Sequence, residues 1–206
     1  MYALVESGTI TKYFNYPKGF TLGDLQYPAD IFTKWSVEEK KAIGIHEVIF
    51  DDSNKKYDKW YKNTGQTFAF ANNTVTASYG TAFAKAHADT LWTQDEIDDG
   101  DAPEDTSPGD IKTRGLKYNL IQILKSKVAN ELARTDWYIT RKTEKSTAIP
   151  SAISTHRDAV RTKQASMETA ITNANDTPAL ETLYTYTEDS DGVQSRPLGE
   201  LPTLEI

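Results

Sequence analysis

The side chains best suited to chemistry are three histidines and the polar groups near the last of them. His46, His87 and His156 lie far apart in the sequence, and none belongs to an HExxH or HxH pattern. Glycine-rich phosphate loops and the GxSxG nucleophile pattern do not occur. His156 is followed by Arg157 and Arg161, which could bind an anion, although such residues more often form the polar face of a helix. These patterns favour a protein without enzymatic activity.

A dense run of carboxylates, "QDEIDDGDAPEDTSPGD" at residues 94–110, raises the question of a calcium site. An EF-hand loop needs oxygen ligands at positions 1, 3 and 5 and a glutamate at position 12. Counted from Asp95, position 3 is Ile97 and position 12 is Thr106, so the match fails. We therefore expect no metal, and interpret the run as a solvated linker that could lie against a basic surface of its own or a neighbouring chain.

Composition excludes further classes of protein. The chain of 206 residues has no cysteine, which removes disulfide and thiolate chemistry. Its net charge of -7 argues against a general nucleic-acid binder. It has no apolar run long enough to cross a membrane, and its first residues lack the pattern of a secretory signal. We expect synthesis in a cytoplasm, with no nucleic-acid or membrane partner.

Charge divides the chain into four blocks. Residues 1–93 are neutral overall, residues 94–110 carry eight acids and no base, residues 111–175 have a net charge of +7, and residues 176–206 have a net charge of -6. These blocks predict an α+β protein in which a small β-rich N-terminal module (1–93) is joined by an acidic linker (94–110) to a C-terminal α-helical hairpin (111–175), followed by an extended tail (176–206).

The N-terminal block shows strand and turn signals. Alternation around Ser7-Gly8 predicts a hairpin, and Ser36 with Glu39 predicts a capping box at the start of a short helix that Gly44 ends. A strand is expected at residues 46–52. Two or three more strands are expected within residues 56–80, joined by turns at 63–65 and 72–73.

The basic block shows helical periodicity. One helix is expected over residues 113–134 and a second from Pro150, at its first turn, to about Asn175. The apolar stripes that support them are Leu116, Leu120, Leu124, Val128 and Leu132 in the first helix, and Ile153, Val160, Met167 and Ala174 in the second. The tail shows strand-like alternation at residues 183–187, and if ordered it should dock on another subunit.

Between the two helices lies "LARTDWYITRKTEKSTAIP", residues 132–150, which we interpret as a rigid corner. Asp136 can cap a turn after the first helix, and Trp137 can fill the joint between the helices. If its indole is buried, Trp137→Ala should cost roughly 3–5 kcal/mol. Trp137 and Tyr138 could alternatively stack on RNA, but the acidic flanking blocks favour protein contacts.

Ion pairs could hold this corner together in two ways. Arg141 and Glu144 are three residues apart and can pair on one helical face. Alternatively, Asp136 or Glu144 could reach Arg157 or Arg161 on the second helix.

The order of these residues resembles a group of tailed-bacteriophage tail proteins, which include tail fibre and tail fibre assembly proteins. Their C-terminal pattern is L-x-x-T-D-W, then R-x-x-E, then I-P, then R-x-x-x-R. In this sequence the pattern falls on Leu132, Thr135, Asp136, Trp137, Arg141, Glu144, Ile149, Pro150, Arg157 and Arg161. The upstream segments "YPADIFTKWSVEEKKAIGIHEV" and "LWTQDEI" are also similar, so the resemblance covers residues 1 to about 175. One departure is Lys145-Ser146, where the group commonly has a glycine.

The resemblance implies a structural, non-enzymatic tail component without a cofactor. We expect an adaptor or fibre-network subunit in the virion tail, attached to other tail proteins and oligomeric within the particle. The alternative is a tail fibre assembly chaperone absent from the mature particle. A third hypothesis, a binder of host carbohydrate, rests on the aromatic residues between Tyr57 and Phe70.

Overall fold

The computed structural model describes residues 1–204 and has an α+β fold. Both strands and helices are present, and the chain divides into two compact units, the first from Met1 to Phe83 and the second from Ala84 onward. The first unit thus ends ten residues before the expected module boundary at residue 93. Each unit is described by itself below.

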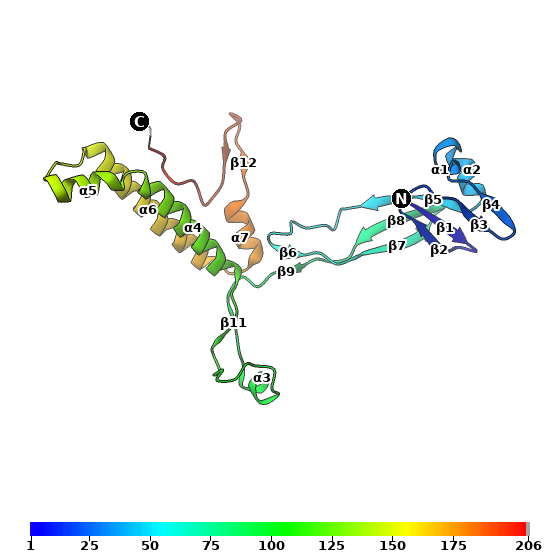
Figure 1. The fold of residues 1–206 in the computed structure, drawn as a ribbon, viewed down its shortest axis with the longest axis horizontal. Coiled ribbons are helices and arrows are strands. Elements are labelled where there is room, and N and C mark those ends of the chain that lie inside the picture. The colour runs from blue at the N-terminus through cyan, green and yellow to red at the C-terminus, as the bar shows by residue number, and fades with distance from the viewer. Residues whose placement is uncertain (205–206) are drawn as a thin grey trace. The chain divides into compact units, whose positions relative to one another are not determined.

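A five-stranded curled sheet forms the centre of the first unit (Figure 1). Its strand order is β2-β1-β5-β8-β7, with β5 and β8 parallel and the other pairs antiparallel. The strands are β1 (Tyr2–Glu6), β2 (Thr9–Phe14), β5 (Ile45–Asp51), β7 (Gln66–Ala71) and β8 (Thr74–Tyr79). The rings of Tyr13 and Phe68 lie 4.8 Å apart, so the two edge strands approach each other as the sheet curls.

Two of the expected hairpins are confirmed. Ser7 (φ 50°) and Gly8 (φ 80°) join β1 to β2, and Asn72 (φ 50°) and Asn73 (φ 58°) join β7 to β8. Positive φ at both central residues gives the turn the twist of the flanking strands, which is why Gly and Asn occupy these positions.

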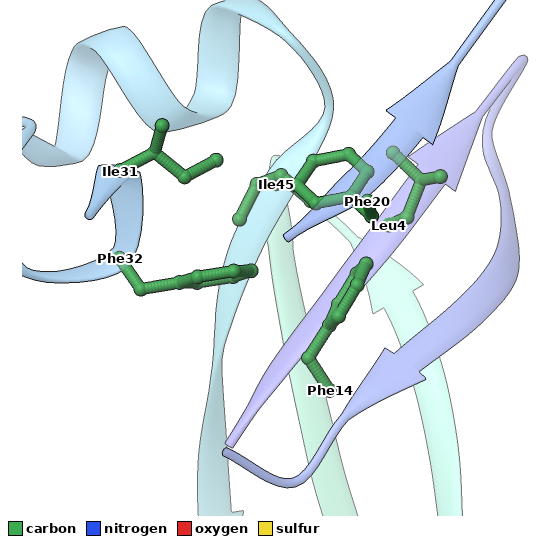
Figure 2. Packing of buried hydrophobic residues seen from close by; sticks show 6 residues of the cluster. All are labelled: Leu4, Phe14, Phe20, Ile31, Phe32 and Ile45. Carbon is green, nitrogen blue, oxygen red and sulfur yellow. The ribbon is translucent and has the colours of Figure 1, made fainter. Parts of the chain in front are cut away.

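One end of the sheet is covered by two short helices, α1 (Ile31–Lys34) and α2 (Val37–Ala42), and by a hairpin of β3 (Phe20–Leu22) and β4 (Leu25–Tyr27). The expected capping box of α2 is present, with the Glu39 N–H donating to the Ser36 hydroxyl at 3.1 Å. Figure 2 shows the core that results, an aromatic and aliphatic cluster in which the Phe14 and Phe20 rings lie 4.9 Å apart. The buried members of this cluster are Leu4, Phe14, Phe20, Ile31, Phe32 and Ile45.

The expected turn at residues 63–65 does not join neighbouring strands. The strand before it, β6 (Tyr61–Lys62), pairs with β9 (Phe83–Ala84) and not with β7. The reason is local, because the Asn63 side chain accepts from the Lys56 N–H and donates to the Lys56 carbonyl, both at 2.8 Å. These bonds fold the segment back on residues 56–58 instead of closing a hairpin.

In the second unit, the acidic run 94–110 is a closed loop and differs from the expected unpacked linker. It is carried by a ribbon of β10 (Thr90–Leu91) and β11 (Ile111–Thr113) and begins with the short helix α3 (Gln94–Asp98), which Thr93 caps. Backbone bonds from the Trp92 N–H to the Asp110 carbonyl and from the Gly109 N–H to the Trp92 carbonyl, both 2.9 Å, close its ends. Lys112 also reaches Glu96 at 2.6 Å. Local turns and capping therefore order a segment that has almost no apolar residues.

Three helices follow, where a two-helix hairpin was expected. The long helices α4 (Leu116–Ala133) and α6 (Ser151–Asn173) pack side by side, and α5 (Asp136–Lys145) lies between them in the sequence (Figure 1). The predicted stripes are largely confirmed, since they supply the buried residues Leu120, Leu124, Val128, Ile153, Val160, Met167 and Ala174. Leu116 and Leu132, at the two ends of α4, are only half-buried.

The tail prediction is wrong in its secondary structure, because a helix takes the place of the expected strand. Residues 177–184 form the helix α7 (Thr177–Tyr184), which Asp176 caps through a 2.7 Å bond from the Ala179 N–H. A short hairpin follows, β12 (Thr187–Glu188) with β13 (Gln194–Ser195), and the chain then returns so that the Leu198 N–H donates to the Leu183 carbonyl. Leu180 and Leu198 are buried, so the tail packs on its own chain, and its docking on another subunit stays a prediction.

Candidate functional site: a corner between helices α4, α5 and α6

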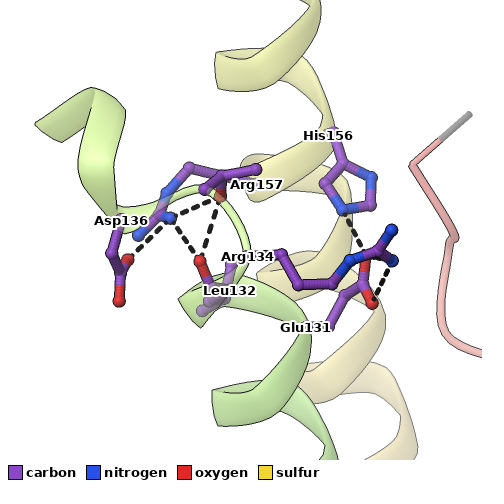
Figure 3. Close-up of polar contacts among 7 residues, drawn as sticks. Glu131, Leu132, Arg134, Asp136, His156 and Arg157 are labelled. Carbon is purple, nitrogen blue, oxygen red and sulfur yellow. Dashed lines mark hydrogen bonds and ion pairs between the residues drawn. The ribbon is translucent and has the colours of Figure 1, made fainter. Parts of the chain in front are cut away.

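The corner where α4 ends and α5 begins is held by one arginine from α6. Nη1 of Arg157 lies 2.8 Å from the Leu132 carbonyl oxygen, 2.7 Å from Thr135 Oγ1 and 2.8 Å from Asp136 Oδ1 (Figure 3). The last carbonyls of a helix have no partner within it, and the Leu132 carbonyl finds its donors in Arg157 and in the N–H and hydroxyl of Thr135. Arg157 is only 8% exposed and Thr135 only 1%. The guanidinium thus fixes the break between two helices.

A second polar contact, next to Arg157, joins α6 to α4 through His156 and Glu131. Nε2 of His156 is 3.0 Å from Glu131 Oε1, and Arg134 donates to the same carboxylate (Figure 3). Burial of Glu131 opposes its ionisation, but the hydrogen bonds and charges of Arg134 and His156 outweigh that effect and lower its pKa. This Glu131–His156 contact was not anticipated, because sequence spacing does not show which residues of two separate helices face each other.

Trp137 does not fill the joint, which corrects the expectation that it would be buried there. Its side chain is 51% exposed. The joint is instead occupied by the smaller Thr135, which packs beneath Arg157. Trp137 lies against Tyr138, with ring centroids 3.9 Å apart, and the Arg141 guanidinium lies 4.6 Å from the indole and 5.2 Å from the Tyr138 ring. The result is an aromatic and cationic cluster at the surface.

Among the expected ion pairs, the structure contains the one between Asp136 and Arg157. Asp136 is the first residue of α5, and its side chain makes no capping bond, so the expected capping role is not found. Arg141 and Glu144 form no ion pair with each other within the described residues, because the Arg141 guanidinium lies over the rings. Arg161 remains exposed and pairs with Asp158 at 3.4 Å, outside the corner.

Pro150 and Ser146 shape the connection from α5 to α6. Pro150 immediately precedes the first residue of α6, and its carbonyl accepts from the N–H groups of Ile153 (3.0 Å) and Ser154 (3.2 Å). Ser146 ends α5 with φ 54°, the left-handed conformation that favours glycine. Glycine would adopt this conformation without the steric cost that serine carries.

Other candidate groups do not join this corner. His46 lies in the first unit, is 3% exposed, and lines a hollow of about 370 Å³ together with Lys41 and Ile49. Its Nδ1 is buried and has no hydrogen-bond partner within residues 1–204. In the same described range, no group of three or more histidine and carboxylate side chains is arranged to hold a metal ion.

The aromatic residues behind the carbohydrate hypothesis have mixed surroundings. Trp60 is buried, whereas Tyr57 is 67% exposed. Phe68 and Phe70 are half-buried and pack on the sheet core. These residues therefore do not form one exposed aromatic platform.

Comparisons with protein-family models, with curated proteins and with solved structures found no match for this chain. None of the described helices is both long and apolar enough to cross a membrane. The corner itself joins buried polar contacts around Arg157 to an exposed aromatic and cationic cluster.

Proposed function

We propose that this chain is a structural, non-enzymatic component of a bacteriophage tail, an adaptor or fibre-network subunit that mediates protein–protein attachment in the virion. The observation that carries the proposal is the corner. Residues of the T-D-W and R-x-x-x-R elements, Thr135, Asp136 and Arg157, bond to one another, while Trp137 faces solvent. Residues that fix a bend between two helices and leave an aromatic side chain exposed suit a surface for protein–protein attachment.

The layout of the chain adds support. The chain divides into a sheet unit and a second unit, and within the second unit the acidic loop on its ribbon and the basic helices differ in charge. Such a division suits a subunit that contacts several neighbours. The partners expected on this basis are other tail proteins and further copies of the same chain.

Quantitative mass spectrometry of purified virions tests the proposal. A stoichiometric number of copies, in a fixed ratio to the known tail proteins of the same particle, is the expected result. Particles that are infectious and lack the protein would contradict it.

The alternative is a tail fibre assembly chaperone, for which an exposed aromatic face would serve transient binding. Co-expression distinguishes the two. A fibre protein that becomes soluble only in the presence of this chain, together with virions that lack the chain, would establish the chaperone and reject the structural role.

A further inference from the structure

Helix α5 presents one side on which aromatic and basic residues gather. Helical spacing places Trp137, Arg141 and Lys145 in one row and Tyr138 and Lys142 in the adjacent row, so the five share a face, called here the α5 face. Glu144, three residues after Arg141, lies at the edge of this face, and Asp136 is turned toward Arg157. The α5 face therefore combines two rings with three positive charges and one negative charge at its edge.

No ion pair with a described residue neutralises these charges. Within residues 1–204, Arg141, Lys142 and Lys145 form no ion pair, and the Arg141 Nε is buried without a hydrogen-bond partner. Arg141 is held by the Trp137 and Tyr138 rings alone. Trp, Tyr and Arg are the residue types that dominate binding energy at protein interfaces. The α5 face has the composition of a binding surface without a partner in place.

The same chain carries a surface of opposite charge. Five side chains of the loop 94–110 are exposed and make no hydrogen bond or ion pair within the described part of the chain: Asp95, Asp99, Asp101, Glu104 and Asp105. No ion pair among the described residues joins this loop to α5. The backbone bonds at the base of the loop hold it closed as a unit.

We propose that the α5 face binds the acidic loop 94–110 of a second copy of this chain. This proposal rests on the proposed function, because it assigns the surfaces through which copies of an attachment subunit would bind one another. The two surfaces are different, so the contact is head-to-tail, and its repetition builds a ring or a filament. The charges orient the two copies and speed their encounter, and Trp137 contributes apolar area at the centre of the contact. A nucleic acid would have to overcome the eight acids of the loop, which disfavours it as the occupant.

The first experiment measures self-association of the full-length chain by sedimentation velocity over a range of protein concentrations. Wild type should associate at low salt and dissociate as sodium chloride is raised from about 50 mM to about 500 mM, because salt screens the contact. The double variant Lys142→Glu/Lys145→Glu should weaken association about tenfold or more. The matched control Lys125→Glu/Lys127→Glu, with the same charge change on exposed α4 positions, should associate as wild type does.

A charge exchange provides the decisive test. Changing the five loop acids to lysine gives a second variant that should not self-associate, because its loop and its α5 face are both basic. Mixed with Lys142→Glu/Lys145→Glu, it should form complexes, since each variant then complements the other. Failure of the mixture to associate, or undiminished association of either variant alone, overturns the proposal. So does binding of a labelled single-stranded oligonucleotide that Lys142→Glu/Lys145→Glu abolishes while self-association persists.

The outcomes separate this proposal from the function on which it rests. A chain that stays monomeric at all concentrations, yet occurs at stoichiometric copy in virions, refutes the head-to-tail contact and leaves the structural role standing. The chain could instead associate in a salt-sensitive way, with the two charge variants forming complexes only when mixed, while virions lack the chain. That result refutes the structural role and supports the head-to-tail contact.

Discussion

Arg157, buried in the second turn of α6, reaches Asp136 at the start of α5 through a single nitrogen, at 2.8 Å. The two partners differ in environment, since the arginine side chain is 9% exposed and the aspartate side chain 61%. The aspartate is therefore the weaker part of the contact, and the buried bonds to Leu132 and Thr135 contribute most of its stability.

Arg157→Leu is expected to lower the free energy of unfolding by about 2–4 kcal/mol, because the Leu132 carbonyl and the Thr135 hydroxyl lose a charged donor. Arg161→Leu serves as the control, and its exposed pair with Asp158 should contribute less than about 1 kcal/mol. Urea unfolding of both full-length variants checks the difference. Equal effects of the two substitutions would contradict the assigned role of Arg157.

Trp137→Ala should change stability by less than about 1 kcal/mol, since the indole is half exposed and leaves no cavity. Leu180→Ala, a fully buried position in the same unit, should cost about 2–5 kcal/mol. Thermal melting of the two variants side by side makes the comparison. A large loss for Trp137→Ala would show that the tryptophan supports the fold after all.

Ser146→Gly should stabilise the chain by roughly 1 kcal/mol, because glycine adopts the left-handed conformation at the end of α5 without steric cost. Ser126→Gly, an exposed position inside α4, should destabilise it by several tenths of a kcal/mol. Chemical denaturation of both variants measures the two changes in the free energy of unfolding, which should have opposite signs. Changes of the same sign would contradict the prediction.

His46 predicts a dependence of stability on pH. Burial, and next the nearby charge of Lys41, lower its pKa below the ordinary 6.5, against the opposing effect of a hydrogen bond that the ring donates to the Asn73 backbone. The unfolded chain therefore binds this proton more readily, so stability should fall as the pH drops below about 6.5. His46→Gln should reduce that slope, and denaturation curves between about pH 5 and pH 8 would measure it. An unchanged slope would mean that other groups set the pH dependence.

Sequence patterns predicted the local features of this fold well. The Ser7-Gly8 turn, the Ser36 capping box and the apolar stripe on α6 each depend on residues close together in the chain, and each was confirmed. The tail was mispredicted because short alternation at residues 183–187 was weighed above the cap at Asp176, which begins a helix with Pro178 in its first turn.

The corner was predicted only in part. Its position between two helices follows from sequence order, and the pairing of Asp136 with Arg157 was one of several pairings that charge allowed. The exposure of Trp137 could not be predicted in this way, because a large apolar side chain is normally expected to be buried. In the structure Thr135 packs beneath Arg157 and occupies the joint, so the indole lies outside. Which residue occupies a joint is decided by three-dimensional fit, and spacing along one chain does not determine it.

The closed base of the acidic loop has a consequence for engineering and for natural variation. Because Trp92 bonds to both Gly109 and Asp110, the two ends of the segment are already adjacent before the loop begins. Lengthening the loop by several residues then adds little closure entropy, and shortening it to a tight turn keeps the ribbon intact. We therefore expect the segment to accept a peptide tag or a foreign recognition sequence while the strand pairing at its base is kept.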